Sequence, residues 1–149
     1  MPIREILRPP LWLMALYAFF FASCIIAIWA AFDTRATLLA SALSVAALIW
    51  IWIASPLRIV VSDQLHVGDA HLEFRYIKDV EPVDGATMKL LRTRDADPAA
   101  FLALRFWTPA GIKVTLNDDR DPTPYWLISC RTGKTLTSAL LAQRDAEKG

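Results

Sequence analysis

The sequence predicts an α+β membrane protein, in which a two-helix transmembrane hairpin precedes a small antiparallel β domain with a C-terminal helix. Residues 11–32 and 36–54 carry no charge, and each run matches the roughly 20 apolar residues that a bilayer-spanning helix needs. From Leu57 onward, short runs alternate between apolar and polar residues, which is typical of half-buried strands. Near the C-terminus, apolar residues recur at helical spacing instead.

The segment before the first span is a short basic flank, with Arg4 and Arg8 against Glu5 and with two prolines at its end. The run 11–32 is longer than the apolar core of a secretory signal, which has about 7–15 residues. Phe21-Ala22-Ser23-Cys24 is close to a lipoprotein cleavage box. Because the apolar run continues past Cys24, we favour an uncleaved span over a lipidated N-terminus.

The two spans are joined by Asp33-Thr34-Arg35, and three polar residues suffice to connect antiparallel helices. Aromatic residues lie near the end of the hairpin that carries both chain termini, and together they form an expected interfacial belt (Trp12, Tyr17, Trp50 and Trp52). Neither span contains a charge, so the sequence offers no proton relay or ion path.

Basic residues flank this same end of the hairpin: Arg4, Arg8 and Arg58, against Arg35 in the connecting loop. The positive-inside rule therefore places both termini in the cytoplasm, with the protein in the cell membrane. We divide the chain into a hairpin, residues 1–56, and a cytosolic β domain, residues 57–149. Since only Ser55-Pro56 separates span from strand, the domain is expected against the cytoplasmic leaflet.

The β domain is predicted to contain about seven strands, and a terminal helix over residues 134–146 that Thr132 caps. A short helix is expected over residues 87–92, and Gly68-Asp69 and residues 117–124 are expected as turns or loops. The predicted strands cover residues 57–61, 65–67, 72–76, 78–83, 101–106, 112–116 and 125–130.

Composition excludes several classes of function. The net charge is +1, and the β domain balances its acidic and basic residues, so no basic face for nucleic acid is expected. Nor does the sequence contain the cluster of about 4–8 basic residues that recognises anionic lipid. Two cysteines, one per unit, argue against a disulfide framework. No catalytic constellation and no cofactor motif is present, so we expect a protein that is not an enzyme and takes no cofactor.

A domain of about seven strands, with a terminal helix that closes one end of the sheet, is similar to the pleckstrin-homology superfold. A more specific resemblance rests on Asp121-Pro122-Thr123-Pro124-Tyr125-Trp126, together with Leu65-His66-Val67-Gly68-Asp69, Ala96-Asp97-Pro98, Arg105 with Trp107, and Arg131. These segments and the two spans resemble an actinobacterial membrane family known only as domain of unknown function 3093. The resemblance implies the architecture and supplies no activity. Gly133 departs from the family, in which a proline or similar residue is expected to start the last helix.

Six residues are the candidates for a binding site, because aromatic and arginine side chains dominate binding hot spots. They are Arg105, Trp107, Asp121, Tyr125, Trp126 and Arg131. Core packing explains Trp126 equally well. An anion site of Arg105, Arg120 and Arg131 is the less favoured alternative, since the first hairpin turn, Ser62-Asp63-Gln64, lacks the basic residues of lipid-binding pleckstrin-homology domains.

Two groups of side chains contain possible metal ligands, but neither has the spacing of a standard metal site. Asp118, Asp119 and Asp121 have the oxygen ligands that a divalent cation prefers, but their spacing is that of ordinary turns. His66 and His71 flank the Gly68-Asp69 turn without a third strong ligand at a standard spacing. Cys130 lies within an apolar strand, where a thiol is expected to be inert.

We therefore expect a membrane-anchored binding or scaffolding protein whose cytosolic domain docks a membrane or cytosolic protein partner at the inner membrane face. The alternative is a protein that binds a lipid or another amphipathic ligand at the membrane interface.

Overall fold

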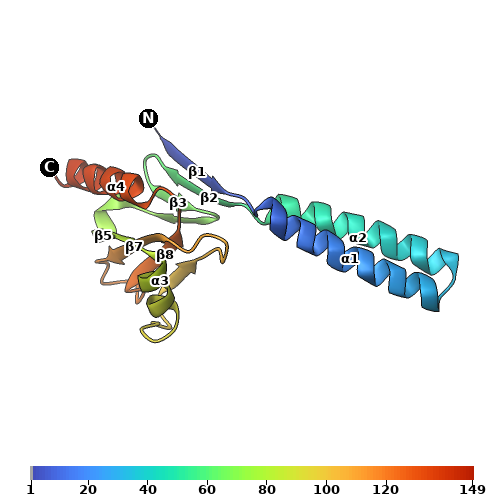
Figure 1. The fold of residues 1–149 in the computed structure, drawn as a ribbon. Coiled ribbons are helices and arrows are strands. Elements are labelled where there is room, and N and C mark those ends of the chain that lie inside the picture. The colour runs from blue at the N-terminus through green and yellow to red at the C-terminus, as the bar shows by residue number, and fades with distance from the viewer. Residues whose placement is uncertain (1) are drawn as a thin grey trace. The chain divides into compact units, whose positions relative to one another are not determined.

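The computed structural model describes residues 2–149, which divide into two compact units (Figure 1). One unit is Arg8–Pro56, and the other joins the residues up to Leu7 with Leu57–Gly149. The hairpin is therefore an insertion into the β domain rather than a leader before it.

The first unit is an antiparallel pair of helices, α1 (Leu11–Ala31) and α2 (Thr34–Ala54), lying side by side (Figure 1). The connection is shorter than the sequence predicts, because Thr34 and Arg35 belong to α2. The cause is Asp33, whose carboxylate accepts a hydrogen bond from Ala36 N at 2.9 Å and caps the helix. At the other end of the hairpin, the Arg8 guanidinium lies 6.0 Å from the centroid of the Trp52 ring.

Both helices are long and apolar enough to cross a bilayer, as expected. Among their described residues only Leu13 is buried, and leucine, isoleucine and tryptophan side chains are exposed along both. A core helix of a globular domain would bury such a surface, since exposed apolar area is costly in water. The surface of the hairpin is therefore apolar along both helices.

The second unit opens with an antiparallel four-stranded sheet in the order β1-β2-β3-β4. Its strands are β1 (Ile3–Leu7), β2 (Leu57–Val61), β3 (Leu65–Val67) and β4 (Ala70–Leu72). The sequence analysis identifies this segment only as a basic flank and predicts no strand in it, so β1 is an element that it missed. β1 pairs with β2 over its whole length, from Ile3 opposite Val61 to Leu7 opposite Leu57.

The predicted turn at Gly68-Asp69 is confirmed and links β3 to β4. Gly68 has φ +62°, a backbone conformation that residues with a side chain rarely adopt. Its amide donates a hydrogen bond to Arg58 O at 2.8 Å. The strand predicted to continue to Tyr76 is wrong beyond Leu72. Phe74–Tyr76 forms a 3₁₀ turn, η1, that buries Phe74 and turns the chain toward the second sheet.

The second sheet has the order β5-β7-β8-β6. Its strands are β5 (Ile77–Val83), β6 (Phe101–Ala103), β7 (Gly111–Leu116) and β8 (Tyr125–Ser129). β6 runs parallel to β8, so the domain is antiparallel-rich but not wholly antiparallel as predicted. β6 also ends at Ala103, short of the predicted Phe106. Over residues 2–149 there are eight strands rather than about seven, because β1 joins them.

Two helices complete the β domain: α3 (Gly85–Arg92), between β5 and β6, and α4 (Gly133–Lys148), at the C-terminus. Asp84 caps α3 by accepting a hydrogen bond from Thr87 N at 2.8 Å. Thr132 occupies the predicted cap position of α4, but its side chain makes no capping hydrogen bond to the helix. Its hydroxyl donates instead to Glu5 of β1, at 2.6 Å.

The second sheet buries both of its faces. The main core lies between the two sheets and α4 and contains Ile59, Leu65, Ile112, Ile128 and Leu140. A smaller cluster under α3 contains Val83, Met88, Tyr125 and Leu127. Gly111 permits this second contact, because a Cβ there would lie 2.0 Å from Ile128 O and 2.6 Å from Met88 Cε.

Candidate functional site

The six residues selected from the sequence do not converge on one site. Successive side chains of a strand point to opposite faces, and Tyr125 and Trp126 are neighbours in β8. Trp126 therefore belongs to the main core, where its ring lies 4.3 Å from that of Phe101. Tyr125 belongs to the cluster under α3, and Lys113 Nζ lies 4.8 Å from its ring centroid. Both rings are nearly inaccessible, so they pack the domain and offer little surface to a partner.

Arg105 and Trp107 do come together, in the loop that follows β6. The Arg105 guanidinium lies 5.9 Å from the centroid of the Trp107 ring, within the range of a cation–π contact. The loop is anchored to the sheet because Arg105 N donates to Ser129 Oγ at 3.0 Å, and Thr108 N donates to Arg105 O at 3.0 Å. The Arg105–Trp107 pair thus stiffens a loop that presents Phe106.

A groove of about 470 Å³ lies between this loop and α3. One wall is a single face of the helix, since its lining residues recur at helical spacing: Gly85, Met88, Lys89, Arg92 and Thr93. The other wall is Phe106 and Pro109. Phe106 is 58% exposed and meets Trp107 edge to face, with ring centroids 5.0 Å apart.

The groove is positively charged. Lys89 and Arg92 are exposed and lie one turn apart on α3. Within the part of the chain that the structure describes, neither side chain makes an ion pair or a hydrogen bond. Two unpaired cations beside an exposed aromatic ring suit an acidic ligand that also carries an apolar group. The sequence predicts the helix itself, but the partner wall becomes visible only in the fold.

The same loop also holds buried polar atoms that no protein atom satisfies. Among residues 2–149, four such side-chain atoms occur, and two are neighbours here: Trp107 Nε1 and Thr108 Oγ1. Burying an unpaired polar group costs free energy, and an ordered water or a bound polar group would offset that cost.

The acidic loop has the geometry of turns rather than of a cation site. Asp118 accepts from Arg120 N at 3.0 Å and Asp121 accepts from Thr123 N at 2.9 Å. Hydrogen bonds donated by Thr123 hold the pKa of Asp121 below its usual value. His66 and His71 pair across β3 and β4, with ring centroids 6.3 Å apart. In the described residues, no group of three or more metal-ligating side chains gathers.

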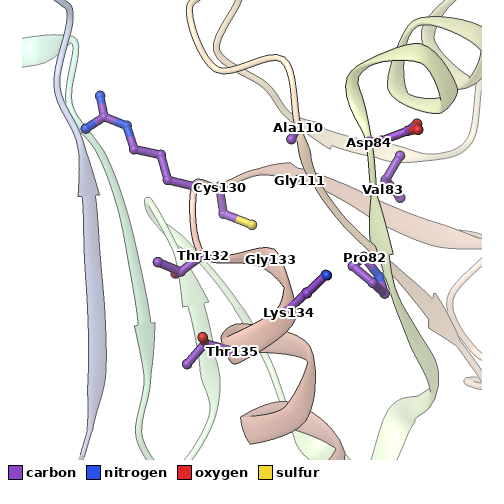
Figure 2. Close-up of a pocket in the computed structure, with 11 residues that line it drawn as sticks. Pro82, Val83, Asp84, Ala110, Gly111, Cys130, Thr132, Gly133, Lys134 and Thr135 are labelled. Carbon is purple, nitrogen blue, oxygen red and sulfur yellow. The ribbon is translucent and has the colours of Figure 1, made fainter.

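A second groove, of about 500 Å³, lies at the start of α4 (Figure 2). It is bounded by Pro82–Asp84, Ala110–Gly111 and Cys130–Thr135. Arg131 lies here, with its backbone N–H donating to Glu5 Oε1 at 2.6 Å. Both partners of the Glu5 carboxylate, Arg131 N and the Thr132 hydroxyl, lie just before Gly133, the first residue of α4.

Figure 2 shows the Cys130 sulfur turned toward the space between Gly111 and Gly133. Burial, and secondarily the nearby Glu5 carboxylate, raise the pKa of this thiol to about 12. The thiolate is the nucleophilic form of cysteine, so the protonated Cys130 is suited to packing rather than catalysis.

The fold and the groove define a class: a small α+β domain, interrupted by an apolar helical hairpin, with a cationic and aromatic groove on its surface. The chain belongs to the family described as protein of unknown function DUF3093, which it matches over residues 3–140. That range spans both units. No curated protein and no solved structure matches the chain.

Proposed function

We propose that this chain is a membrane-anchored docking protein that recruits a protein partner, through an acidic segment, to the inner face of the cell membrane. The observation that carries the proposal is the groove between α3 and the Phe106–Pro109 loop, with its unpaired Lys89 and Arg92. A partner segment with two acidic residues would pair with the cations while an apolar side chain packs on Phe106. The partner is therefore expected to be acidic at its docking segment.

In this proposal the hairpin is the membrane anchor, and α1 and α2 cross the bilayer. Because β1 and β2 pair in one sheet, the two ends of the hairpin emerge on the same side of any membrane that it crosses. The positive-inside rule makes that side cytoplasmic. The domain is interpreted as pleckstrin-homology-like on the strength of its two sheets and its terminal helix, and the parallel β6–β8 pair is its departure from that layout.

The orientation is tested with a single cysteine at the tip of the hairpin. Thr34→Cys is made in a chain in which Cys24 and Cys130 are alanine. A membrane-impermeant maleimide added to intact cells is expected to label this chain, and a cysteine at exposed Lys148 is expected to react only after lysis. The reverse pattern would place the β domain outside the cell.

Docking is tested with a photo-cross-linking amino acid at Phe106 in the full-length protein in its native membranes. We expect capture of a protein segment rich in Asp and Glu. Lys89→Glu with Arg92→Glu is expected to reduce capture about tenfold, because like charges then face each other. Lys78→Glu with Lys148→Glu changes the charge equally at exposed positions elsewhere and is expected to leave capture intact.

Two outcomes would overturn the docking proposal. Capture that is insensitive to Lys89→Glu with Arg92→Glu would show that the groove does not select its ligand by charge. Capture of lipid alone, both by the parent chain and by Lys78→Glu with Lys148→Glu, would favour the alternative of an amphipathic ligand at the membrane interface.

Tyr125→Ala would not test binding, because Tyr125 packs the cluster under α3 and its loss would damage the fold.

A further inference from the structure

The first sheet leaves one of its faces open. Its inner face packs the main core through Leu7, Ile59 and Leu65. The alternate side chains point the other way and are exposed or half-buried. This outer face consists of Arg4, Ile6, Arg58, Val60, His66 and His71.

Strand register places the charged, imidazole and apolar side chains of this face in two neighbouring rows. Arg4 lies opposite Val60, Val60 opposite His66, and His66 opposite His71, in one row across all four strands. The next row places Ile6 opposite Arg58, and Ile6 is 48% exposed. Arg4 comes from before the hairpin and the other charged groups from after it. No stretch of sequence shows the cluster, because only the β1–β2 pairing assembles it.

Acidic groups stay at the rim of this face. Glu5, the one acidic residue of β1, points to the inner side and is held by Arg131 N and Thr132 Oγ1. Asp63 and Asp69 lie in the turns at the two ends of β3. Asp63 receives the Ser62 hydroxyl at 2.6 Å and lies 3.9 Å from His66 Nε2. Among the described residues, neither aspartate makes an ion pair with Arg4 or Arg58.

Chain connectivity keeps the Ile6–Arg58 row near the bilayer that the hairpin is proposed to cross. Arg58 follows the last residue of α2 by four positions and Ile6 precedes the first residue of α1 by five. Extended chain spans at most about 3.6 Å per residue, so both positions remain within roughly 20 Å of a helix end. Headgroups extend the bilayer beyond its hydrocarbon core by about 5–8 Å on each side.

We propose that the outer face of the first sheet binds the anionic phospholipid surface of this same membrane, with Arg4 and Arg58 on headgroup phosphates and Ile6 in the interface between them. Guanidinium groups pair with phosphate through two parallel hydrogen bonds, and the imidazoles add donors. Each arginine near an anionic surface strengthens attachment about fivefold. The inference rests on the proposed spanning hairpin and is independent of the protein partner.

The test uses full-length protein in nanodiscs of phosphatidylcholine alone or mixed equally with phosphatidylglycerol. A photo-cross-linking amino acid replaces Ile6, and a second chain carries it at Leu102, an exposed apolar position on β6. Lipid capture from position 6 is expected to be about fivefold higher or more in the anionic discs. Capture from position 102 is expected to be low and equal in both.

Charge variants test whether Arg4 and Arg58 attract the anionic lipid. Arg4→Glu with Arg58→Glu is expected to lower capture in anionic discs to the level in phosphatidylcholine, and Arg4→Lys with Arg58→Lys to retain most of it. Arg4→Gln with Arg58→Gln provides a milder loss of charge if reversal disturbs the sheet. Equal capture in the two kinds of disc, or capture unaffected by these changes, would overturn the proposal. Release of the protein from discs by alkaline carbonate would instead overturn the spanning hairpin itself.

Discussion

Thr132 donates its hydroxyl to the carboxylate of Glu5, at 2.6 Å, across 127 positions of the chain. The second oxygen of Glu5 accepts the backbone N–H of Arg131, also at 2.6 Å. A carboxylate on the inner face of an edge strand would be costly if unpaired. Here it satisfies groups at the start of α4, and so it ties the strand before the hairpin to the helix that ends the domain.

Removal of this link is expected to loosen β1. Glu5→Ala should lower the free energy of unfolding of the β domain by about 2 kcal/mol, since hydrogen bonds to a charged group contribute about 1.5–3 kcal/mol. Thr132→Ala should cost less, because Arg131 N still binds Glu5. The measurement is denaturant unfolding of the full-length protein in detergent for both single variants and the double variant. Fully additive losses would contradict the link, because interacting residues couple.

Gly111 is expected to tolerate no side chain. A Cβ there would lie 2.0 Å from Ile128 O, and backbone cannot yield as a flexible side chain does. Gly111→Ala should therefore cost about 3 kcal/mol, at the upper end of overpacking penalties. Gly85→Ala is the matched control, because its Cβ would meet Pro109 Cβ at an ordinary 3.4 Å. Equal thermal stability of the two variants would refute the close approach of β7 and β8.

The capped start of α3 should respond to acid. Hydrogen bonds from Thr87, first from its side chain and then from its backbone, lower the pKa of Asp84 below 3.8. Stability from this cap is therefore present above about pH 4 and lost as the pH falls through the lower folded-state pKa. Amide exchange in α3 at about pH 5 and about pH 3 measures the loss. Asp84→Asn keeps a capping oxygen that does not titrate. An equal loss of protection at acid pH in that variant would show that protonation of Asp84 is not the cause.

Cys130 is expected to resist alkylation in the folded protein. Its thiol has a pKa of about 12, so it stays protonated at neutral pH. In a Cys24→Ala chain, iodoacetamide should modify Cys130 only after denaturation. Because the folded pKa lies above the ordinary value of 9.0, stability is also expected to decline as the pH rises from about 9 toward 12. Rapid labelling of the native protein at neutral pH would contradict the buried position.

Tyr125→Phe is expected to preserve or raise stability. The Tyr125 hydroxyl is buried, and no protein atom described satisfies it. Removal of an unpaired buried polar group should gain about 1 kcal/mol, whereas Tyr125→Ala should cost about 3 kcal/mol through the cavity it leaves. Thermal unfolding of both variants in the same detergent compares them. A loss of stability in Tyr125→Phe would reveal a hydrogen bond by that hydroxyl.

Only some of the residues at the candidate groove and its loop could be predicted from the sequence. Arg105 and Trp107 stand out in the sequence by residue type, and the structure brings that pair together. Tyr125 and Trp126 stand out for the same reason, yet the pleat of β8 sends them to opposite faces. Lys89, Arg92 and Phe106 carry no local signal of function, since a charged helix surface and a loop aromatic are each ordinary.

The sequence by itself determined the two apolar helices, most of the strands after Leu57 and the terminal helix. Those features follow from composition and periodicity, which report locally whether a segment faces water, core or lipid. Ile3–Leu7 lacks a clean alternation, so its place in a sheet was decided by pairing with β2, fifty or more positions away. The parallel β6, the Glu5 link to α4 and the row from Arg4 to His71 were likewise decided by tertiary structure. Each depends on which distant strands share a register, and local patterns of hydrophobicity do not encode that choice.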